Sequence, residues 1–137
     1  MLFRSDINMA HKYVNPKSVA QPMGQYSNCV ETASNLKWLH VAGQVGIDKD
    51  GKLGADFAAQ ANNVWTNLTN CLKECGYTMD DVVRVNHFLT DGRFAQPYRE
   101  IRAKYLGNAK PASTLLIVQG LADPAYYLEV ELTAAKA

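Results

Sequence analysis

Two glutamates near the C-terminal end, Glu129 and Glu131, are the residues of this 137-residue chain with the most evident potential for chemistry. They lie in segment 127–134, in which polar and apolar side chains alternate. Because successive side chains of a strand point to opposite faces, the alternation predicts that both carboxylates share one face. Beside a buried strand such a pair can form a site, or it can simply lie on a solvated edge.

The segment before this strand supplies the expected buried neighbour. Residues 113–119 are almost continuously apolar and include several β-branched side chains, which is typical of a strand buried on both faces. Asp123 and Pro124 predict a turn between the two strands. The last quarter of the chain is therefore expected to position the two glutamates.

The other reactive side chains do not form a recognisable metal or cofactor motif. The three histidines, His11, His40 and His87, lie in separate segments, and the sequence has no His-x-x-x-His or Cys-x-x-Cys pair. We therefore expect no metal, and we expect each histidine to be a surface or hydrogen-bonded strand residue. The sequence also lacks Gly-x-Gly-x-x-Gly and Gly-x-Ser-x-Gly motifs, which argues against a nucleotide cofactor and against serine-hydrolase chemistry.

The composition indicates one ordinary domain, 22–137, after a polar, proline-broken N-terminal arm, 1–21. The net charge of +1 argues against a nucleic-acid partner, because domains that bind nucleic acids concentrate lysine and arginine. An odd number of cysteines, 3, suggests free thiols in a reducing compartment. The sequence shows no stretch with the length and hydrophobicity of a signal peptide or a membrane span, so we expect a soluble, cytoplasmic protein.

Turn residues and hydrophobic spacing divide the chain into the elements that position these side chains. Strands are expected at 25–32 and 36–42, joined as a hairpin, and at 82–89. One helix is expected between Asp56 and Gly76, and a second helix follows the third strand. With the two C-terminal strands, this order predicts an α+β fold in which two helices cover one sheet.

Several motifs also resemble those of a known family. Pro111-Ala112-Ser113-Thr114, the apolar strand after it and Leu128-Glu129-Val130-Glu131 resemble the C-terminal signature of the Rid (YjgF) family of reactive-intermediate deaminases. Further segments match the family in the same order: 24–27, 41–48, 59–61 and 80–89. The resemblance covers residues 22–134 and implies a chorismate-mutase-like fold, a mixed sheet with two helices packed on one face.

The resemblance also implies an assembly and an activity. Rid proteins form homotrimers with the sheets inside, the helices outside and a site in each cleft between subunits. There an imine or enamine of amino-acid metabolism is hydrolysed to a ketone and ammonia without a cofactor. The present chain is therefore expected to be a trimeric, deaminase-like hydrolase of a small metabolite. Some Rid proteins have been described as ribonucleases, but this chain has no basic stripe to favour that activity.

Individual roles follow from position. Glu129 corresponds to the catalytic glutamate that helps to activate water, for which it must hold a water within hydrogen-bond reach of the imine carbon. Tyr26 corresponds to a pocket tyrosine, Gly43 to the glycine after the second strand and Phe94 to an apolar wall, while Ala42 stands where many members have serine. The substrate-binding residues implied in this way are Tyr26, Ala42, Gly43, Phe94, Ser113 and Thr114.

One position departs from the family pattern. Deaminating members carry an arginine that grips the substrate carboxylate where this chain has Ser113, and a hydroxyl cannot reproduce that bidentate fork. Three interpretations stay open: another cation reaches the site, the substrate lacks the carboxylate, or the protein is a non-catalytic metabolite-binding or regulatory trimer. The candidate cations are Lys110, Arg93, Arg99 and Arg102. Arg99 and Arg102 can also belong to a solvated helix face.

Overall fold

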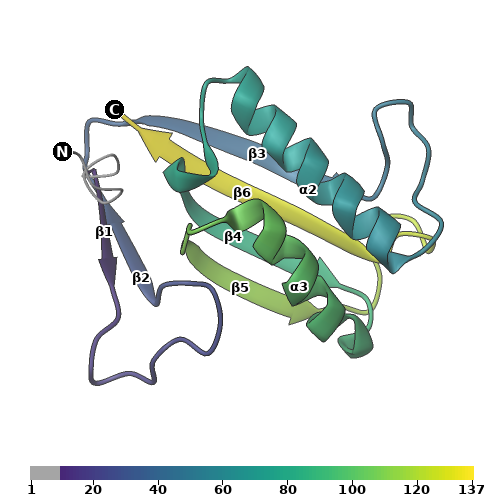
Figure 1. Cartoon of the computed structure of the whole chain (residues 1–137), viewed down its shortest axis with the longest axis horizontal. Coiled ribbons are helices and arrows are strands. Elements are labelled where there is room, and N and C mark those ends of the chain that lie inside the picture. Colours follow the sequence, from purple (N-terminus) through teal and green to yellow (C-terminus); the bar gives the residue numbers. More distant parts are fainter. Residues whose placement is uncertain (1–9) are drawn as a thin grey trace.

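A four-stranded mixed sheet with two α-helices on one face forms the body of the molecule (Figure 1). The structure, a computed structural model, describes residues 10–137. The sheet order is β3-β6-β4-β5, in which β4 and β5 are parallel and the other neighbours are antiparallel. This arrangement confirms the expected α+β fold. The elements are β1 (His11–Val14), β2 (Cys29–Thr32), β3 (Lys37–Val45), α2 (Phe57–Glu74), η1 (Met79–Asp81), β4 (Val82–Leu89), η2 (Gly92–Phe94), α3 (Ala95–Leu106), β5 (Ala112–Ile117) and β6 (Leu128–Lys136).

Helix α2 begins and ends where the sequence predicts. The Asp56 Oδ1 accepts a hydrogen bond of 2.8 Å from the Ala59 backbone N–H and so caps the first turn. Gly76, with a φ of +83°, adopts the left-handed conformation that ends the helix. The apolar face of α2 includes Trp65 and Leu68, both fully buried in the core.

The strand pairing in the first third of the chain differs from the expectation. β2 pairs antiparallel with β1, so that His11 lies opposite Thr32, whereas β3 pairs with β6. The expected hairpin of 25–32 with 36–42 is therefore wrong. The physical reason for the observed pairing is burial. β6 is long enough to pair with most of β3, and the apolar faces of both strands are covered together by α2, whereas β2 has only 4 residues.

Strand β1 lies within the segment expected to be an irregular arm. His11 is buried, and its Nε2 lies 2.9 Å from the Ala135 carbonyl oxygen of β6, which joins the small sheet to the large one. A strand of 4 residues shows little periodicity, so its sequence carries no clear strand signal. The division between arm 1–21 and domain 22–137 stays a prediction, and part of that arm, residues 1–9, lies outside the described residues.

The two C-terminal strands differ in how well the pattern predicts them. β6 alternates as expected, with Leu128 and Val130 fully buried and Glu129 on the opposite face. β5, however, is an edge strand rather than a strand buried on both faces, and Leu116 and Ile117 are 48% and 51% exposed. β5 pairs along its length only with β4, and on its outer side the pairing that the structure shows is a single bridge between Ser27 and Ala112, at the beginning of the strand.

Among residues 10–137, no helix combines the length and the hydrophobicity that crossing a membrane requires.

Candidate functional site

A β-bulge in β3 shapes the sheet face opposite the helices, called here the open face. The register of β3 against β6 shifts between Val41 and Gln44, so Ala42 and Gly43 together stand opposite a single residue of β6. Bulges bend a strand and re-aim its side chains, and they are frequent beside active sites. Both bulge residues were predicted as site residues from the resemblance.

Glu129 lies directly against the bulge. A Cβ atom added to Gly43 would come within 2.0 Å of the Glu129 Oε2, so only glycine leaves room for this carboxylate. Glu129 is half-buried, and its carboxylate makes no hydrogen bond or ion pair with any residue of the described range 10–137. The carboxylate is therefore free to hold a water molecule.

The neighbouring polar groups of the open face are already engaged with each other. Glu131 accepts a hydrogen bond of 3.1 Å from the Asn86 Nδ2, and the Arg84 Nη2 donates one of 2.8 Å to the Thr114 Oγ1. Ala42 lies beside three of them in a shallow cavity of about 340 Å³, whose lining includes Arg84, Asn86 and Glu131. Of the two predicted carboxylates, Glu129 is therefore the unpaired one.

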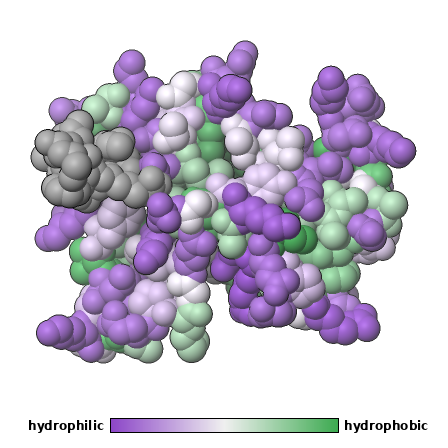
Figure 2. Space-filling view, viewed as in Figure 1, coloured by the Kyte–Doolittle hydropathy of each residue, from purple (hydrophilic) through white to green (hydrophobic). Residues whose placement is uncertain are grey.

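A second cavity lies at the β5 edge of the sheet, between α3 and the loop that precedes β2; it is called here the edge cavity. It measures about 670 Å³, and Tyr26 and Ser113 both line it. The loop is fastened in place because the Ser27 Oγ donates a hydrogen bond of 2.6 Å to the Lys110 carbonyl. Figure 2 shows a hollow at the lower edge of the helix-side face, between this loop and the body of the molecule.

Two of the candidate cations also line the edge cavity. Arg99 is exposed, but Arg102 is only 7% exposed, so the expectation of a solvated helix face fails for Arg102. The Arg102 Cζ lies 5.6 Å from the centroid of the Tyr98 ring, where the ring face attracts a cation. Burial lowers the pKa of Arg102; Tyr98 opposes this shift, and the charge of Arg99 adds to it. The sequence did not signal this burial, because an arginine on a helix is usually solvated.

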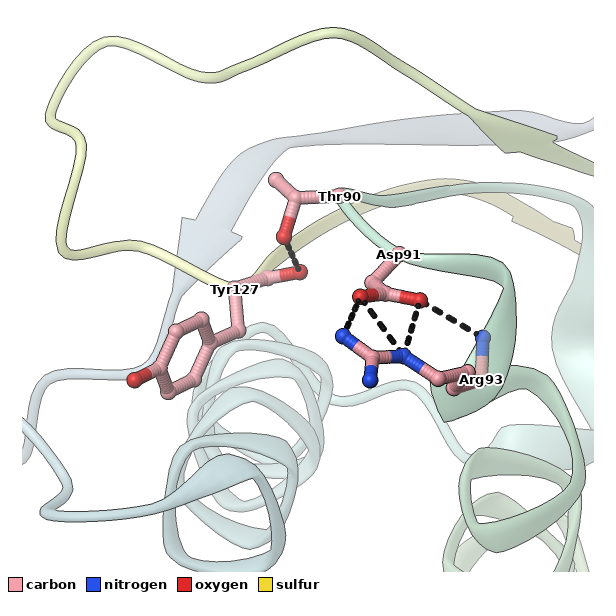
Figure 3. A network of polar contacts seen from close by, with 4 residues as sticks. All are labelled: Thr90, Asp91, Arg93 and Tyr127. Carbon is pink, nitrogen blue, oxygen red and sulfur yellow. Dashed lines mark hydrogen bonds and ion pairs between the residues drawn. The ribbon is translucent and has the colours of Figure 1, made fainter.

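The other two candidate cations do not line this cavity. Arg93 forms an ion pair with Asp91 at the start of α3 (Figure 3), with 2.6 Å between the Nη2 and the Oδ2. Hydrogen bonds from Arg93 lower the pKa of the partly exposed Asp91 to about 2. This pair follows the C-terminal end of β4, whereas Ser113 lies opposite Val85, in the middle of that strand. Lys110 is exposed, and its backbone carbonyl is one of the groups that hold the loop.

Phe94 belongs to the packing of the core rather than to either cavity lining. Its ring stacks on Phe57 with the centroids 4.2 Å apart, and it lies 5.4 Å from the ring of Tyr127. The Tyr127 carbonyl in turn accepts a hydrogen bond of 3.2 Å from the Thr90 Oγ1 (Figure 3). Phe94 therefore lies apart from Tyr26 and Ser113.

A buried hydrogen-bond chain leads from the core to Ser113. The Trp65 Nε1 donates to the Tyr98 Oη at 3.2 Å, the Tyr98 Oη bonds with the His87 Nδ1, and the His87 Nε2 lies 2.8 Å from the Ser113 Oγ. Burial, and secondarily the charge of Arg102, lowers the pKa of His87 to about 3, so its imidazole is neutral at physiological pH. His87 is the hydrogen-bonded strand residue that the sequence predicts, but its link to Ser113 was not predicted.

The donors and acceptors along this series determine the direction of each hydrogen bond. Tyr98 accepts from Trp65, and its own O–H has the His87 Nδ1 as the acceptor within reach. The His87 Nε2 then carries the ring N–H and donates a hydrogen bond to the Ser113 Oγ. The hydroxyl proton of Ser113 is left free to be donated into the edge cavity.

Within one chain, the predicted site residues therefore form two groups. Tyr26 and Ser113 line the edge cavity, and Ser113 faces the helices through its bond to His87. Gly43 and Glu129 lie together on the open face. Among the described residues, no cluster of histidine, cysteine or acidic side chains has an arrangement suited to a metal ion.

Comparisons with known proteins agree with this architecture. A family model described as Endoribonuclease L-PSP matches residues 17–136. The chain is 30% identical over 122 residues to a RutC family protein of Pyrococcus horikoshii, a match that covers 88% of this chain and 94% of that protein. It is 31% identical over 134 residues to a RutC family protein of Leuconostoc mesenteroides subsp. cremoris, covering 93% of this chain and 100% of that protein.

Solved structures give the same result. YyfB of Yersinia pestis, described as a protein of unknown function of the conserved Rid family, superposes with a TM-score of 0.83 at 33% identity. That match covers 93% of this chain and 100% of YyfB. RidA from an Antarctic Psychrobacter has a TM-score of 0.68 at 25% identity, and the match covers 90% of this chain and 98% of RidA.

Proposed function

The chain belongs to the Rid (YjgF) family, and we propose that it is a cofactor-independent hydrolase that deaminates a reactive imine or enamine metabolite. The observation that carries this proposal is the unpaired Glu129 carboxylate, held against Gly43 at the bulge of β3. A half-buried carboxylate without a partner among the described residues is suited to bind a water molecule and to accept its proton.

The chemistry requires only a water molecule and one proton acceptor. Water adds to the imine carbon, its oxygen forms the new C–O bond, and Glu129 accepts the released proton. The C=N π electron pair moves to nitrogen, which takes this proton from Glu129, and a carbinolamine results. Glu129 then carries the hydroxyl proton of the carbinolamine to nitrogen, the C–N bond breaks with its electron pair leaving on nitrogen, and the products are a ketone and ammonia. An enamine first takes a proton on carbon and loses one from nitrogen, which gives the imine that enters the same steps.

We further propose that the site is completed between subunits of a homotrimer. The supporting observation is the half-exposed apolar edge at Leu116 and Ile117, which a neighbouring subunit can cover. In such an assembly, the edge cavity with Tyr26 and Ser113 would meet the open face of the next subunit with Glu129. A small metabolite would then be enclosed by the two half-sites.

The test is imine hydrolysis by the purified protein. 2-Imino acids and uncarboxylated imines are generated in situ, and their decay is followed with wild type, Glu129→Gln and Glu131→Gln. We expect Glu129→Gln to lower the rate about a hundredfold or more, the usual contribution of a general base. Glu131→Gln is the matched control, because it removes a paired carboxylate from the same face, and we expect it to retain most of the activity.

The alternative is a metabolite-binding or regulatory trimer that has lost the chemistry. It is favoured by Ser113, which replaces the cation of the deaminating members, and by Ala42, which removes a hydroxyl. Equal decay with wild type, Glu129→Gln and no protein across the whole panel would contradict the enzyme and leave this alternative.

A further inference from the structure

The edge cavity carries two positive charges without a negative one. Arg99 and Arg102 both line it, and the part of its wall formed by residues 10–137 contains no aspartate or glutamate. The two arginines are three residues apart on α3, which places them on neighbouring positions of one helix face. Two like charges on one wall repel each other, and an anion bound between them or near them would offset this repulsion.

Arg102 shows the imbalance most clearly, because its side chain is largely buried. It is 7% exposed, yet it forms no ion pair with any carboxylate in the described part of the chain. The end of its guanidinium lies at the cavity wall, since a Cβ atom added to Gly24 would be 3.8 Å from the Nη2. A buried charge without a counter-ion is costly even beside an aromatic ring, and an anion bound in the cavity would offset that cost.

Ser113 adds a neutral donor to the same wall. Its Oγ accepts a hydrogen bond from the His87 Nε2, with 2.8 Å between the two atoms. The hydroxyl group of Ser113 can therefore donate a hydrogen bond to a ligand. His87 is 2% exposed and is itself held by Tyr98, and its bond to Ser113 helps to hold the Ser113 Oγ in place. His87 and Tyr98 are positioning residues here, because they act only through Ser113.

We propose that the edge cavity binds the carboxylate of a small metabolite, with Arg102 and Arg99 as the cations and the Ser113 hydroxyl as an additional donor. Guanidinium groups hold carboxylates through paired N–H donors, and two of them with a hydroxyl can satisfy both carboxylate oxygens. This assignment rests on the proposed function in that it orients the substrate, with its carboxylate against α3 and its imine carbon toward Glu129. The positive charge absent at Ser113 is thus supplied by the neighbouring helix.

The test is calorimetric titration of the full chain with probes that do not react. Pyruvate supplies the carboxylate, hydroxyacetone is a similar molecule without it, and inorganic phosphate is a different oxyanion. We expect saturable binding of pyruvate, weaker binding of phosphate and no measurable binding of hydroxyacetone. Arg102→Gln should raise the Kd for pyruvate about tenfold or more, and Arg99→Gln and Ser113→Ala several-fold each, as for hydrogen bonds to a charged group.

Lys104→Gln is the matched control, because it removes an exposed positive charge from the same helix, and we expect it to leave the Kd unchanged. Arg99 is exposed, so its variant decides the question even where Arg102→Gln does not fold. The assignment is overturned by an unchanged Kd in folded Arg99 and Arg102 variants, by hydroxyacetone binding as tightly as pyruvate, by phosphate binding more tightly than pyruvate, or by no binding of pyruvate.

The same titration separates the anion site from the proposed activity. In Glu129→Gln, the Kd for pyruvate should still rise when Arg99 is replaced, because Arg99 and Arg102 hold the carboxylate while Glu129 faces the other end of the ligand in the proposed site. Arginine-dependent binding by a protein that hydrolyses no imine would support the anion site and contradict the proposed activity. Glu129-dependent hydrolysis with a Kd that ignores both arginines would support the activity and overturn the anion site.

Discussion

At the scale of single residues, His87 shows how strongly surroundings define a side chain. It is a strand residue with no metal-binding neighbour in the sequence, yet it lies 2% exposed between Tyr98 and Ser113. Its buried imidazole stays neutral, donates to Ser113 and accepts from Tyr98. A polar group of the edge cavity, the Ser113 hydroxyl, is therefore held by a histidine that is itself buried.

The neutral state of His87 predicts acid-dependent stability. Its pKa is about 3 in the folded chain and about 6.5 in the unfolded chain, so below pH 6.5 the unfolded state binds the proton and the folded state does not. This group's contribution is therefore complete above pH 6.5 and is lost as the pH falls toward 3. We expect a loss of about 1.4 kcal/mol per pH unit within that window.

Denaturant unfolding at several pH values measures this dependence. His87→Gln should unfold more easily than wild type at pH 7, because it disturbs the bonds to Tyr98 and Ser113, but with a shallower decline between pH 6.5 and 5. His40→Gln, which replaces an exposed histidine of β3, serves as the control. A decline equally steep in His87→Gln and wild type would show that His87 is not responsible.

At the scale of elements, the bulge of β3 links chain geometry to the proposed catalysis. The register shift between Val41 and Gln44 brings Gly43 under Glu129, and only the missing side chain of Gly43 makes room for the carboxylate. Bulges of this kind re-aim the residues of a strand. The bulge is therefore the local feature on which the position of the carboxylate depends.

We expect Gly43→Ala to displace Glu129 and to lower imine hydrolysis about as much as Glu129→Gln does. Since the added atom meets the far end of a flexible side chain, at 2.0 Å from the Oε2, the fold should lose much less than the activity. Steady-state rates and thermal unfolding measured on the same samples separate these effects. Gly92→Ala is the control, because an added Cβ there meets nothing within 4 Å. Full activity in Gly43→Ala would show that the position of Glu129 against Gly43 is not required for hydrolysis.

At the scale of the whole molecule, the single chain leaves its predicted site divided. Tyr26 and Ser113 lie at the β5 edge, whereas Gly43 and Glu129 lie on the open face. An apolar edge strand with half-exposed side chains is a surface that proteins usually cover. The proposed trimer would cover this edge and unite the two groups.

We expect the chain to be a trimer in solution and Leu116→Asp to dissociate it. A charge introduced at a residue that is 48% exposed in the single chain should hardly affect folding, but it should oppose burial between subunits. Light scattering after size exclusion measures the mass, and imine hydrolysis should disappear together with the trimer. Val19→Asp, at a residue 50% exposed on the loop before β2, is the control; a wild-type monomer would contradict the shared site.

Patterns between near neighbours in the sequence determined a large part of this protein. Asp56 and Gly76 mark the beginning and the end of α2, and the alternation in β6 places Glu129 and Leu128 on opposite faces of the sheet. Both features were predictable because capping, φ preference and strand periodicity act within a few residues. The motifs of Ser113 and Glu129 likewise identified the family before any contact was known. These properties depend on local chemistry, which the order of residues specifies directly.

Contacts between distant segments were decided only by the tertiary structure. β2 pairs with β1 rather than with β3, and β5 is an exposed edge strand. Arg102 is a buried cation that lines the same cavity as Ser113. Each outcome depends on which apolar faces can be buried together and on which charges then lose solvent. Such competition involves residues far apart along the chain, so no local sequence pattern predicts its outcome. It also determines which arginines lie where the carboxylate of the proposed substrate would bind.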